Sequence, residues 1–335
     1  MNTIVCIYRR LRRAVLAQFG KPAAMPASDD DRLDVLTQKV LLVVYDPVVD
    51  QASGLTLSQK MHWQNAEELI NGYIADIDES SGGLVKFQVV ERIDRDEFPL
   101  KVGGFLYDVN TYFTQPKPPF ADGGADYYQI ISDLNLLTRI DDHEIDEVWI
   151  IAFPFAGFNE SIMVGRCAFP CNSNPLDNTD QCSRRFVMMG FSYERYVGQM
   201  LEDFCHRAES ILAYIYNPAK GEANLYARFV RYDKVKPGES EVGSVHYAPN
   251  SDSDYDYGNP RYVTSRCDDW FNFPVFKNET KQVNCDAWGS DETHPDDRWT
   301  RNHHKWWLNH LPRKVGRTNG IANNWWKYIV DPNRV

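Results

Sequence analysis

The chain has 335 residues, of which 43% are hydrophobic and 13% aromatic, a composition typical of a globular protein and not of a disordered one. Its formal net charge of -11 argues against nonspecific binding to nucleic acids and against docking on anionic membranes. No run of about 20 apolar residues is present, so no membrane-spanning helix is expected.

The N-terminus differs from the rest of the chain in charge. Residues 1–28 contain four arginines and one lysine but no acidic residue. The apolar run at 14–17 is too short for the core of a signal peptide, so no standard secretory signal is recognised. An organelle-targeting segment is compatible with this composition, but a disordered basic tail is the favoured interpretation, and we assign residues 1–36 to it.

Two β-branched apolar runs and a helical pattern follow. Residues 39–45 predict a strand that is buried on both faces, and Asp46-Pro47 ends it. A helix with one apolar face is expected over about 65–79, where a pair of glycines stops it. Residues 84–90 predict the second strand, so the chain begins with a strand–helix–strand unit.

The same alternation continues after a loop-like stretch. The sequence predicts a helix over 125–137, a third buried strand over 147–153, a short edge strand over 186–190 and a long helix over 193–216. Strands that alternate with helices indicate a mainly parallel sheet with right-handed crossovers. We therefore predict an α/β domain over 37–217, in which the three buried apolar runs are neighbouring strands.

The pattern weakens after residue 217. Residues 233–300 are rich in Asp, Asn, Gly, Pro, Tyr and Trp, which predicts loops packed by aromatic side chains, and a short helix is expected over 301–310. We expect 218–335 to form an aromatic-rich, loop-rich C-terminal extension that packs on the α/β domain. The tryptophan pairs at 306–307 and 325–326 are expected to fill this region, with stacking on sugar rings as the alternative.

The helix over 193–216 carries the most informative pattern. Apolar residues spaced three or four apart form one buried stripe, and beside it Glu202, His206 and Glu209 share a helix face. Gly198 and Ala213 bracket this line, and such small residues indicate that the face is covered. Two carboxylates and an imidazole on a covered face need a cation, a metal ion or a dense hydrogen-bond network.

Two interpretations of this face stay open. In the first, Glu202, His206 and Glu209 are ligands of zinc, which accepts imidazole nitrogen and carboxylate oxygen, and Asp203 stands where a helical zinc hydrolase places its general base. In the second, they belong to a salt-bridge ladder in which Asp203 pairs with Arg207 and His206 is held between Glu202 and Glu209. Such pairs, when exposed, contribute only a few tenths of a kcal/mol each.

The order of elements and the sequence Glu-Asp-Phe-Cys-His at 202–206 resemble the zincin metallopeptidases, the metzincins in particular. The resemblance covers residues 39–216 and implies a zincin-like fold with His206 as a metal ligand. The zincin motif His-Glu-x-x-His is matched only at its last residue, because Glu202 and Asp203 replace its first two. The metzincin glycine and third histidine are absent, and Glu209 follows His206 instead.

The whole chain also resembles a family of bacterial secreted proteins, to which we attach no activity. The stretches that carry this second resemblance are residues 157–161, 193–195, 206–210 and 323–326.

Further candidates lie outside the helix. Glu160 follows the third predicted strand, and loops at the carboxyl ends of parallel strands commonly bind ligands, so Glu160 is a candidate acid, base or ligand, with turn capping as the alternative. Zinc sites usually recruit one ligand from a distant segment. We therefore expect at least one further histidine to approach His206, the candidates being His246, His303, His304 and His310.

The chain has seven cysteines. Their location in loops favours an exported, secreted or extracytoplasmic protein with Cys171–Cys182 and Cys267–Cys285 disulfides and a free Cys205. The alternative is a cytosolic protein with reduced thiols. The cysteine spacings match no common zinc-finger pattern.

These patterns together predict a zinc-dependent hydrolase that acts on a peptide or carbohydrate substrate, with its site on the helix over 193–216. One alternative is a non-catalytic carbohydrate- or protein-binding protein on a degenerate hydrolase scaffold. Another is a metal-free glycosidase that uses paired carboxylates such as Glu160 and Glu209, whose separation would set the stereochemistry.

Overall fold

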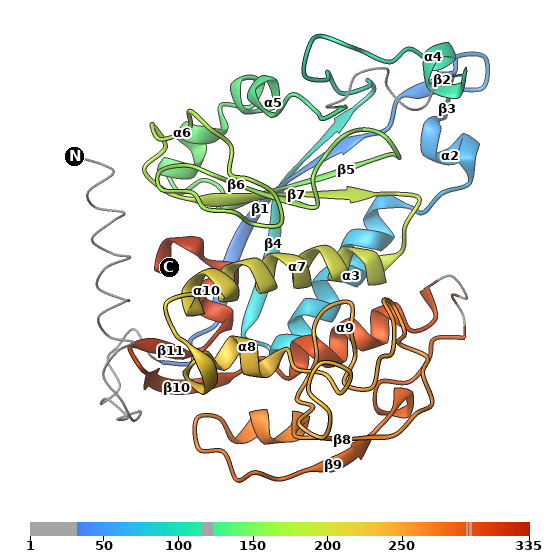
Figure 1. The fold of residues 1–335 in the computed structure, drawn as a ribbon. Coiled ribbons are helices and arrows are strands. Elements are labelled where there is room, and N and C mark those ends of the chain that lie inside the picture. Colours follow the sequence, from blue (N-terminus) through green and yellow to red (C-terminus); the bar gives the residue numbers. More distant parts are fainter. Residues whose placement is uncertain (1–31, 115–122, 293, 295–296) are drawn as a thin grey trace. The chain divides into compact units, whose positions relative to one another are not determined.

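The computed structural model describes residues 32–114, 123–292, 294 and 297–335. Within them the chain forms two compact units that are interleaved along the sequence (Figure 1). One, the sheet unit, comprises Thr37–Ile74 and Phe87–Asp203, and the other, the aromatic unit, comprises Ala75–Lys86 and Phe204–Val335 together with the residues up to Leu36. Helices α3 and α7 and strand β4 run through the boundaries of these units.

Most elements of the sheet unit alternate between strands and helices. Those wholly or partly within it are β1 (Leu36–Tyr45), β2 (Val48–Asp50), β3 (Leu55–Thr56), α2 (Leu57–Met61), α3 (Ala66–Ser81), β4 (Val85–Arg95), α4 (Val109–Thr114), α5 (Tyr127–Asp133), α6 (Leu136–Asp141), β5 (Glu147–Ala152), β6 (Ser161–Val164), β7 (Phe186–Ser192) and the first turns of α7 (Val197–Tyr216).

The central sheet has five strands in the order β4-β1-β5-β7-β6. Strands β1 and β5 pair in parallel, as do β5 and β7, whereas β6 pairs antiparallel with β7. The backbone bonds Leu36 N to Leu84 O at 2.7 Å and Asp46 N to Arg95 O at 3.0 Å show that β4 also runs parallel to β1. The prediction of a mainly parallel α/β sheet is therefore confirmed, and the three predicted apolar runs are neighbours.

Helix α3 covers one face of this sheet through Tyr73, whose side chain is fully buried. The Tyr73 ring lies 5.1 Å from that of Trp149 on β5 and 5.2 Å from that of Phe191 on β7, both edge to face. The predicted helix over 65–79 thus forms where expected, because its apolar face meets aromatic side chains of three strands, including Phe87 on β4.

Three sequence-based expectations for this unit are wrong in detail. Strand β6 lies in a stretch that was expected to be irregular, and it takes the sheet edge, so the predicted edge strand over 186–190 is an interior strand, β7. The helix expected over 125–137 is two helices, α5 and α6, because Asn135 adopts a left-handed conformation with φ 48°. Helix α7 begins at Val197, four residues later than residue 193.

The aromatic unit contains short elements joined by loops. They are α8 (Leu225–Phe229), β8 (Val263–Ser265), β9 (Lys281–Val283), α9 (Thr300–Asn309), β10 (Arg313–Thr318), β11 (Ile321–Asn324), α10 (Trp326–Val330) and the 3-10 helices η2 (Gly221–Ala223), η3 (Cys267–Asn272), η4 (Cys285–Ala287) and η6 (Pro332–Arg334), together with most of α7. The predicted helix over 301–310 corresponds to α9.

Aromatic rings form the core of this unit. The ring of Phe229 lies 5.0 Å from that of Trp270 and 5.5 Å from those of both Trp307 and Trp325, edge to face in each case. Trp307, Trp325 and Trp326 are fully buried. The alternative that these three tryptophans stack on sugar rings is therefore wrong, and they fill the core as the favoured interpretation predicted.

Helix α9 is held against the end of α3 by a buried charge. Asp76, only 3% exposed, lies 2.7 Å from Nε of Arg301 and 3.2 Å from Nζ of Lys305. A buried carboxylate needs such partners, and two cations from one helix turn set the position of α9 within the unit.

The predicted disulfides are wrong. Cys171, Cys182, Cys267 and Cys285 are buried and form no disulfide bond, and Cys205 forms none either, as expected. Their sulfur atoms face other groups: Sγ of Cys182 lies 3.1 Å from the carbonyl oxygen of Arg184, and Sγ of Cys267 lies 3.6 Å from Oδ1 of Asp268. These two pairs therefore no longer support the prediction of export, which itself stays a prediction.

Two further expectations concern the N-terminal segment and the division into domains. The basic segment assigned to residues 1–36 lies outside the described residues except for its last five. The division into 37–217 and 218–335 stays a prediction. None of the helices in the described segments has the length and apolarity needed to cross a bilayer.

Candidate metal site on helix α7

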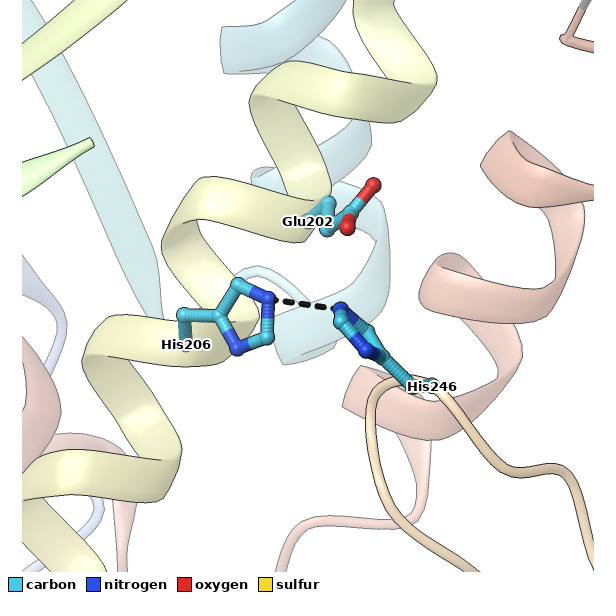
Figure 2. Close-up of side chains that lie close together, drawn as sticks. All are labelled: Glu202, His206 and His246. Carbon is cyan, nitrogen blue, oxygen red and sulfur yellow. Dashed lines mark hydrogen bonds between the residues drawn. The ribbon is translucent and has the colours of Figure 1, made fainter. Parts of the chain in front are cut away.

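Helix α7 presents Glu202 and His206 one turn apart on the same side (Figure 2). The helix forms here because Leu201, Phe204 and Ala208 belong to a fully buried apolar stripe. Glu202 is 8% exposed, and the His206 side chain is 17% exposed. Both side chains are therefore largely shielded from solvent on this face of the helix.

His246, from the loop that follows α8, meets this face of the helix. Nε2 of His206 and Nε2 of His246 lie 3.0 Å apart, with the two rings inclined by 75° (Figure 2). The carboxylate of Glu202 lies beside this pair, so that one ligand atom from each of the three side chains lies within 4.8 Å of the others. Of the four distant histidines considered, His246 is the one in this group.

Each imidazole has a carboxylate at its other nitrogen. Nδ1 of His206 lies 3.3 Å from Oε2 of Glu209, and Nδ1 of His246 lies 3.1 Å from Oδ1 of Asp254. A carboxylate accepts hydrogen bonds, so it favours the tautomer that carries its proton on Nδ1. The Nε2 lone pairs of two neutral rings would then face each other, and that arrangement is repulsive unless a proton or a cation lies between them.

The backbone around the site is held by further polar contacts. Oε1 of Glu209 accepts a hydrogen bond of 3.1 Å from the backbone N–H of Val245, and the Tyr257 hydroxyl donates one of 2.8 Å to the carbonyl oxygen of Val245. Burial and the nearby Glu209 carboxylate raise the pKa of Tyr226 well above its ordinary value, so its hydroxyl stays protonated. Glu209 therefore links His206 to the loop that carries His246.

Tyr255 adds a hydroxyl group to the same place. Its oxygen lies 3.0 Å from Nε2 of His246, and its backbone N–H donates a 3.1 Å hydrogen bond to the carbonyl oxygen of His246. Tyr255 has φ 56°, a left-handed conformation that is rare for a tyrosine and occurs more often at functional sites than elsewhere. The side chain is half exposed, so the group of ligand atoms has a polar, solvent-accessible neighbour.

The separations fit a small divalent cation. Imidazole nitrogens at 2.0–2.1 Å from a tetrahedral zinc ion are about 3.3 Å apart, and the observed 3.0 Å differs by only a few tenths of an ångström. Two histidines and a glutamate are also one of the ligand sets that catalytic zinc sites use. The carboxylates at both Nδ1 atoms match the outer partners that orient metal-binding histidines.

The other predicted site residues lie elsewhere or have other partners. Glu160 is hydrogen-bonded to Nδ2 of Asn172, and Asp203 does not belong to the group of candidate ligands. His303 and His304 are fully buried in α9, where both rings contact Tyr257. His310 belongs to a different side-chain cluster.

Two contributors were not anticipated from the sequence. Asp254 and Tyr255 come from the segment Ser-Asp-Ser-Asp-Tyr-Asp-Tyr at 251–257, whose alternation of acidic and aromatic residues is the only local signal. Such a segment predicts a loop. It contacts His246 because the chain folds back on itself within nine residues.

Comparison with known proteins adds no relative: no protein-family model, no curated protein and no solved structure matches this chain.

Proposed function

We propose that Glu202, His206 and His246 bind one zinc ion and that the protein is a metal-dependent hydrolase acting on a peptide or glycan substrate. The observation that carries the proposal is the pair of Nε2 atoms 3.0 Å apart, each on a ring whose Nδ1 faces a carboxylate, with the Glu202 carboxylate beside them. Three protein ligands leave one position open, as in catalytic zinc sites.

A zinc ion bound there would supply Lewis acidity toward a carbonyl oxygen and toward water. The residues around the ion have different roles. Glu209 and Asp254 keep the protons of His206 and His246 on Nδ1, so that both Nε2 atoms point toward the ion. The Tyr255 hydroxyl, 3.0 Å from Nε2 of His246, would donate a hydrogen bond to an oxygen of the substrate. The assignment of the general base to Glu160 or Asp203 stays a prediction.

We further propose that the scaffold is zincin-like. The support is the order β1, α3, β4, a long connection that contains the short helices α4, α5 and α6, then β5, the antiparallel edge strand β6, β7 and finally the helix α7 that carries the ligand. The zincin motif places a histidine four residues before the one that matches His206, and here that position holds Glu202. The second histidine of the site is instead His246, 40 residues farther along the chain.

The test of the metal site is zinc affinity. Isothermal titration of metal-free protein should show that His206→Ala, His246→Ala and Glu202→Gln each weaken binding at this site at least 100-fold, because each removes one of three ligands. His294→Ala is the matched control, since His294 also has a carboxylate 3.3 Å from Nδ1 but lies outside the group. Unchanged affinity in all three variants would rule out the site.

The test of hydrolysis uses fluorogenic peptide libraries and chromogenic glycosides. Cleavage that is lost with a chelator, restored by zinc and absent in His246→Ala is the expected result. Zinc binding without cleavage of any substrate would favour the non-catalytic binding protein. Glycoside cleavage that survives the chelator but not Glu160→Gln or Glu209→Gln would favour the glycosidase with paired carboxylates.

A further inference from the structure

A second cluster of metal-ligating side chains lies in the aromatic unit, formed by Cys267, Asp268 and His310. Cys267 and Asp268 open the 3-10 helix η3, and His310 is the residue after the last turn of α9. Cys267 is fully buried, His310 is 2% exposed and the Asp268 side chain is 48% exposed. The cluster therefore has a buried sulfur and nitrogen on one side and a solvent-accessible carboxylate on the other.

The separations of the three ligand atoms are those of a tetrahedral zinc site. Nε2 of His310 lies 3.3 Å from Oδ1 of Asp268, and Sγ of Cys267 lies 3.6 Å from the same oxygen. Bond lengths of 2.0–2.1 Å to nitrogen and oxygen and 2.3 Å to sulfur give tetrahedral edges of about 3.3 Å for N···O and about 3.5 Å for S···O. All three atoms lie within 4.8 Å of one another, so one ion can contact them together.

The orientation of His310 is set from its far side. Its Nδ1 lies 2.7 Å from the carbonyl oxygen of Trp306, an acceptor, so the ring carries its proton on Nδ1. In the neutral ring the Nε2 lone pair then faces Oδ1 of Asp268, which is also an acceptor, and a cation between them relieves the repulsion. The rings of Phe271 and Trp306, with centroids 4.5 Å and 4.2 Å from that of His310, leave the imidazole little freedom to turn away.

The other two ligands are positioned in the same way. The backbone N–H of Cys267 donates a 3.0 Å hydrogen bond to Oγ of Ser265, which fixes the start of η3. Nζ of Lys281 lies 2.9 Å from Oδ2 of Asp268 and leaves Oδ1 for the ion. Cysteine binds a divalent cation as its thiolate, so the Cys267 thiol would release its proton when an ion binds.

We propose that Cys267, Asp268 and His310 form a second metal site, selective for a thiolate-binding divalent cation such as zinc. It joins η3 to the end of α9, segments about 42 residues apart in sequence, and so stabilises the aromatic unit. The proposal is independent of the site on helix α7, which contains no sulfur ligand. With three protein ligands and an exposed carboxylate, the fourth position is open to water.

Cobalt(II) distinguishes this site from the first, because only a cobalt–thiolate bond gives an intense charge-transfer band in the near ultraviolet. Reduced, metal-free full-length protein titrated with cobalt(II) should develop this band, with a final intensity that corresponds to one thiolate-bound cobalt ion per chain. Cys267→Ser should abolish it, and Asp268→Asn and His310→Gln should lower the affinity for cobalt at least tenfold. Cys285→Ser, at another buried free cysteine, and His246→Ala, in the first site, should leave the band unchanged.

Absence of the band in the wild-type protein, or its persistence in Cys267→Ser, overturns the proposal. Loss of the band in Cys285→Ser with retention in Cys267→Ser would assign the thiolate to a different site and overturn it as well. Failure of the site on α7 leaves all these results unchanged, so the two proposals stand or fall separately.

Discussion

Nδ1 of His206 lies 3.3 Å from Oε2 of Glu209, three residues ahead on helix α7. The same distance and the same spacing, in the opposite direction, recur at His294 and Asp291, where Nδ1 lies 3.3 Å from Oδ2. The two pairs differ in what lies at the other ring nitrogen. His206 has Nε2 of His246 at 3.0 Å, whereas His294 belongs to neither candidate metal group.

This comparison makes the role of Glu209 testable. Glu209→Gln removes the carboxylate that holds the proton on Nδ1 of His206, and we expect it to weaken zinc binding at the α7 site by about 10–100-fold. Asp291→Asn makes the matched change at the control pair and should leave the affinity unchanged. Isothermal titration measures both, and equal affinities for wild type and Glu209→Gln would remove Glu209 from the site.

Gly157 is required by a close backbone approach. It has φ 90°, and a Cβ at this position would lie 2.4 Å from the carbonyl oxygen of Gly123 and 2.8 Å from the backbone nitrogen of Ala125. We expect Gly157→Ala to lower the free energy of unfolding by about 2–4 kcal/mol, because both the clash and the positive φ are unfavourable.

Gly103 provides the control for this prediction. It has φ 87°, but nothing lies within 4 Å of the Cβ that alanine would add. Gly103→Ala therefore has the conformational cost alone, about 1 kcal/mol. Chemical denaturation of both variants gives the difference between their losses of unfolding free energy, which is the cost of the steric clash alone. Equal losses would show that the close approach of the Gly123 carbonyl oxygen does not require a glycine at position 157.

We expect Lys101 to make the free energy of unfolding depend on pH in the alkaline range. Its side chain is only 1% exposed, and Nζ donates hydrogen bonds to the carbonyl oxygens of Gly123, at 2.8 Å, and Phe155. Burial lowers the pKa of Lys101 from 10.5 to about 8. The unfolded chain therefore binds a proton that the folded chain has released between about pH 8 and 10.5, and stability rises with pH across this window.

The measurement compares wild type with Lys101→Met by urea denaturation between pH 7.5 and 10.5. The stability of the wild type relative to the variant should rise with a slope of up to about 1.4 kcal/mol per pH unit. A difference that stays constant across the window would mean that Lys101 keeps an ordinary pKa in the folded protein.

Arg207 ties helix α7 to the C-terminal helix α10. Its guanidinium is fully buried and donates hydrogen bonds from Nε to the carbonyl oxygen of Ile329, at 3.0 Å, and from Nη2 to that of Val330, at 3.1 Å. Arg207→Met keeps much of the side-chain volume but leaves both acceptors without these donors, so we expect a loss of about 2–4 kcal/mol in unfolding free energy. Arg195→Met, at an exposed position, should change stability by less than about 0.5 kcal/mol.

Local pattern was sufficient for the regular elements. Runs of β-branched apolar residues located β1, β4 and β5, because strands in the interior of a sheet are rich in such residues. The spacing of apolar residues located α3 and α7, because burial of one helix face imposes a helical period. It was insufficient for β6, whose four residues Ser-Ile-Met-Val carry no period of their own and become a strand only by pairing with β7.

The two metal-ligand groups show the same division. The line of Glu202, His206 and Glu209 follows from helix geometry, so the sequence predicts it. The contact of His206 with His246 spans 40 residues, and that of His310 with Asp268 spans 42. The prediction that Cys171 and Cys267 form disulfides was wrong. Contacts at such separations depend on how loops close and how aromatic side chains fill the core between them, and no local periodicity records that packing.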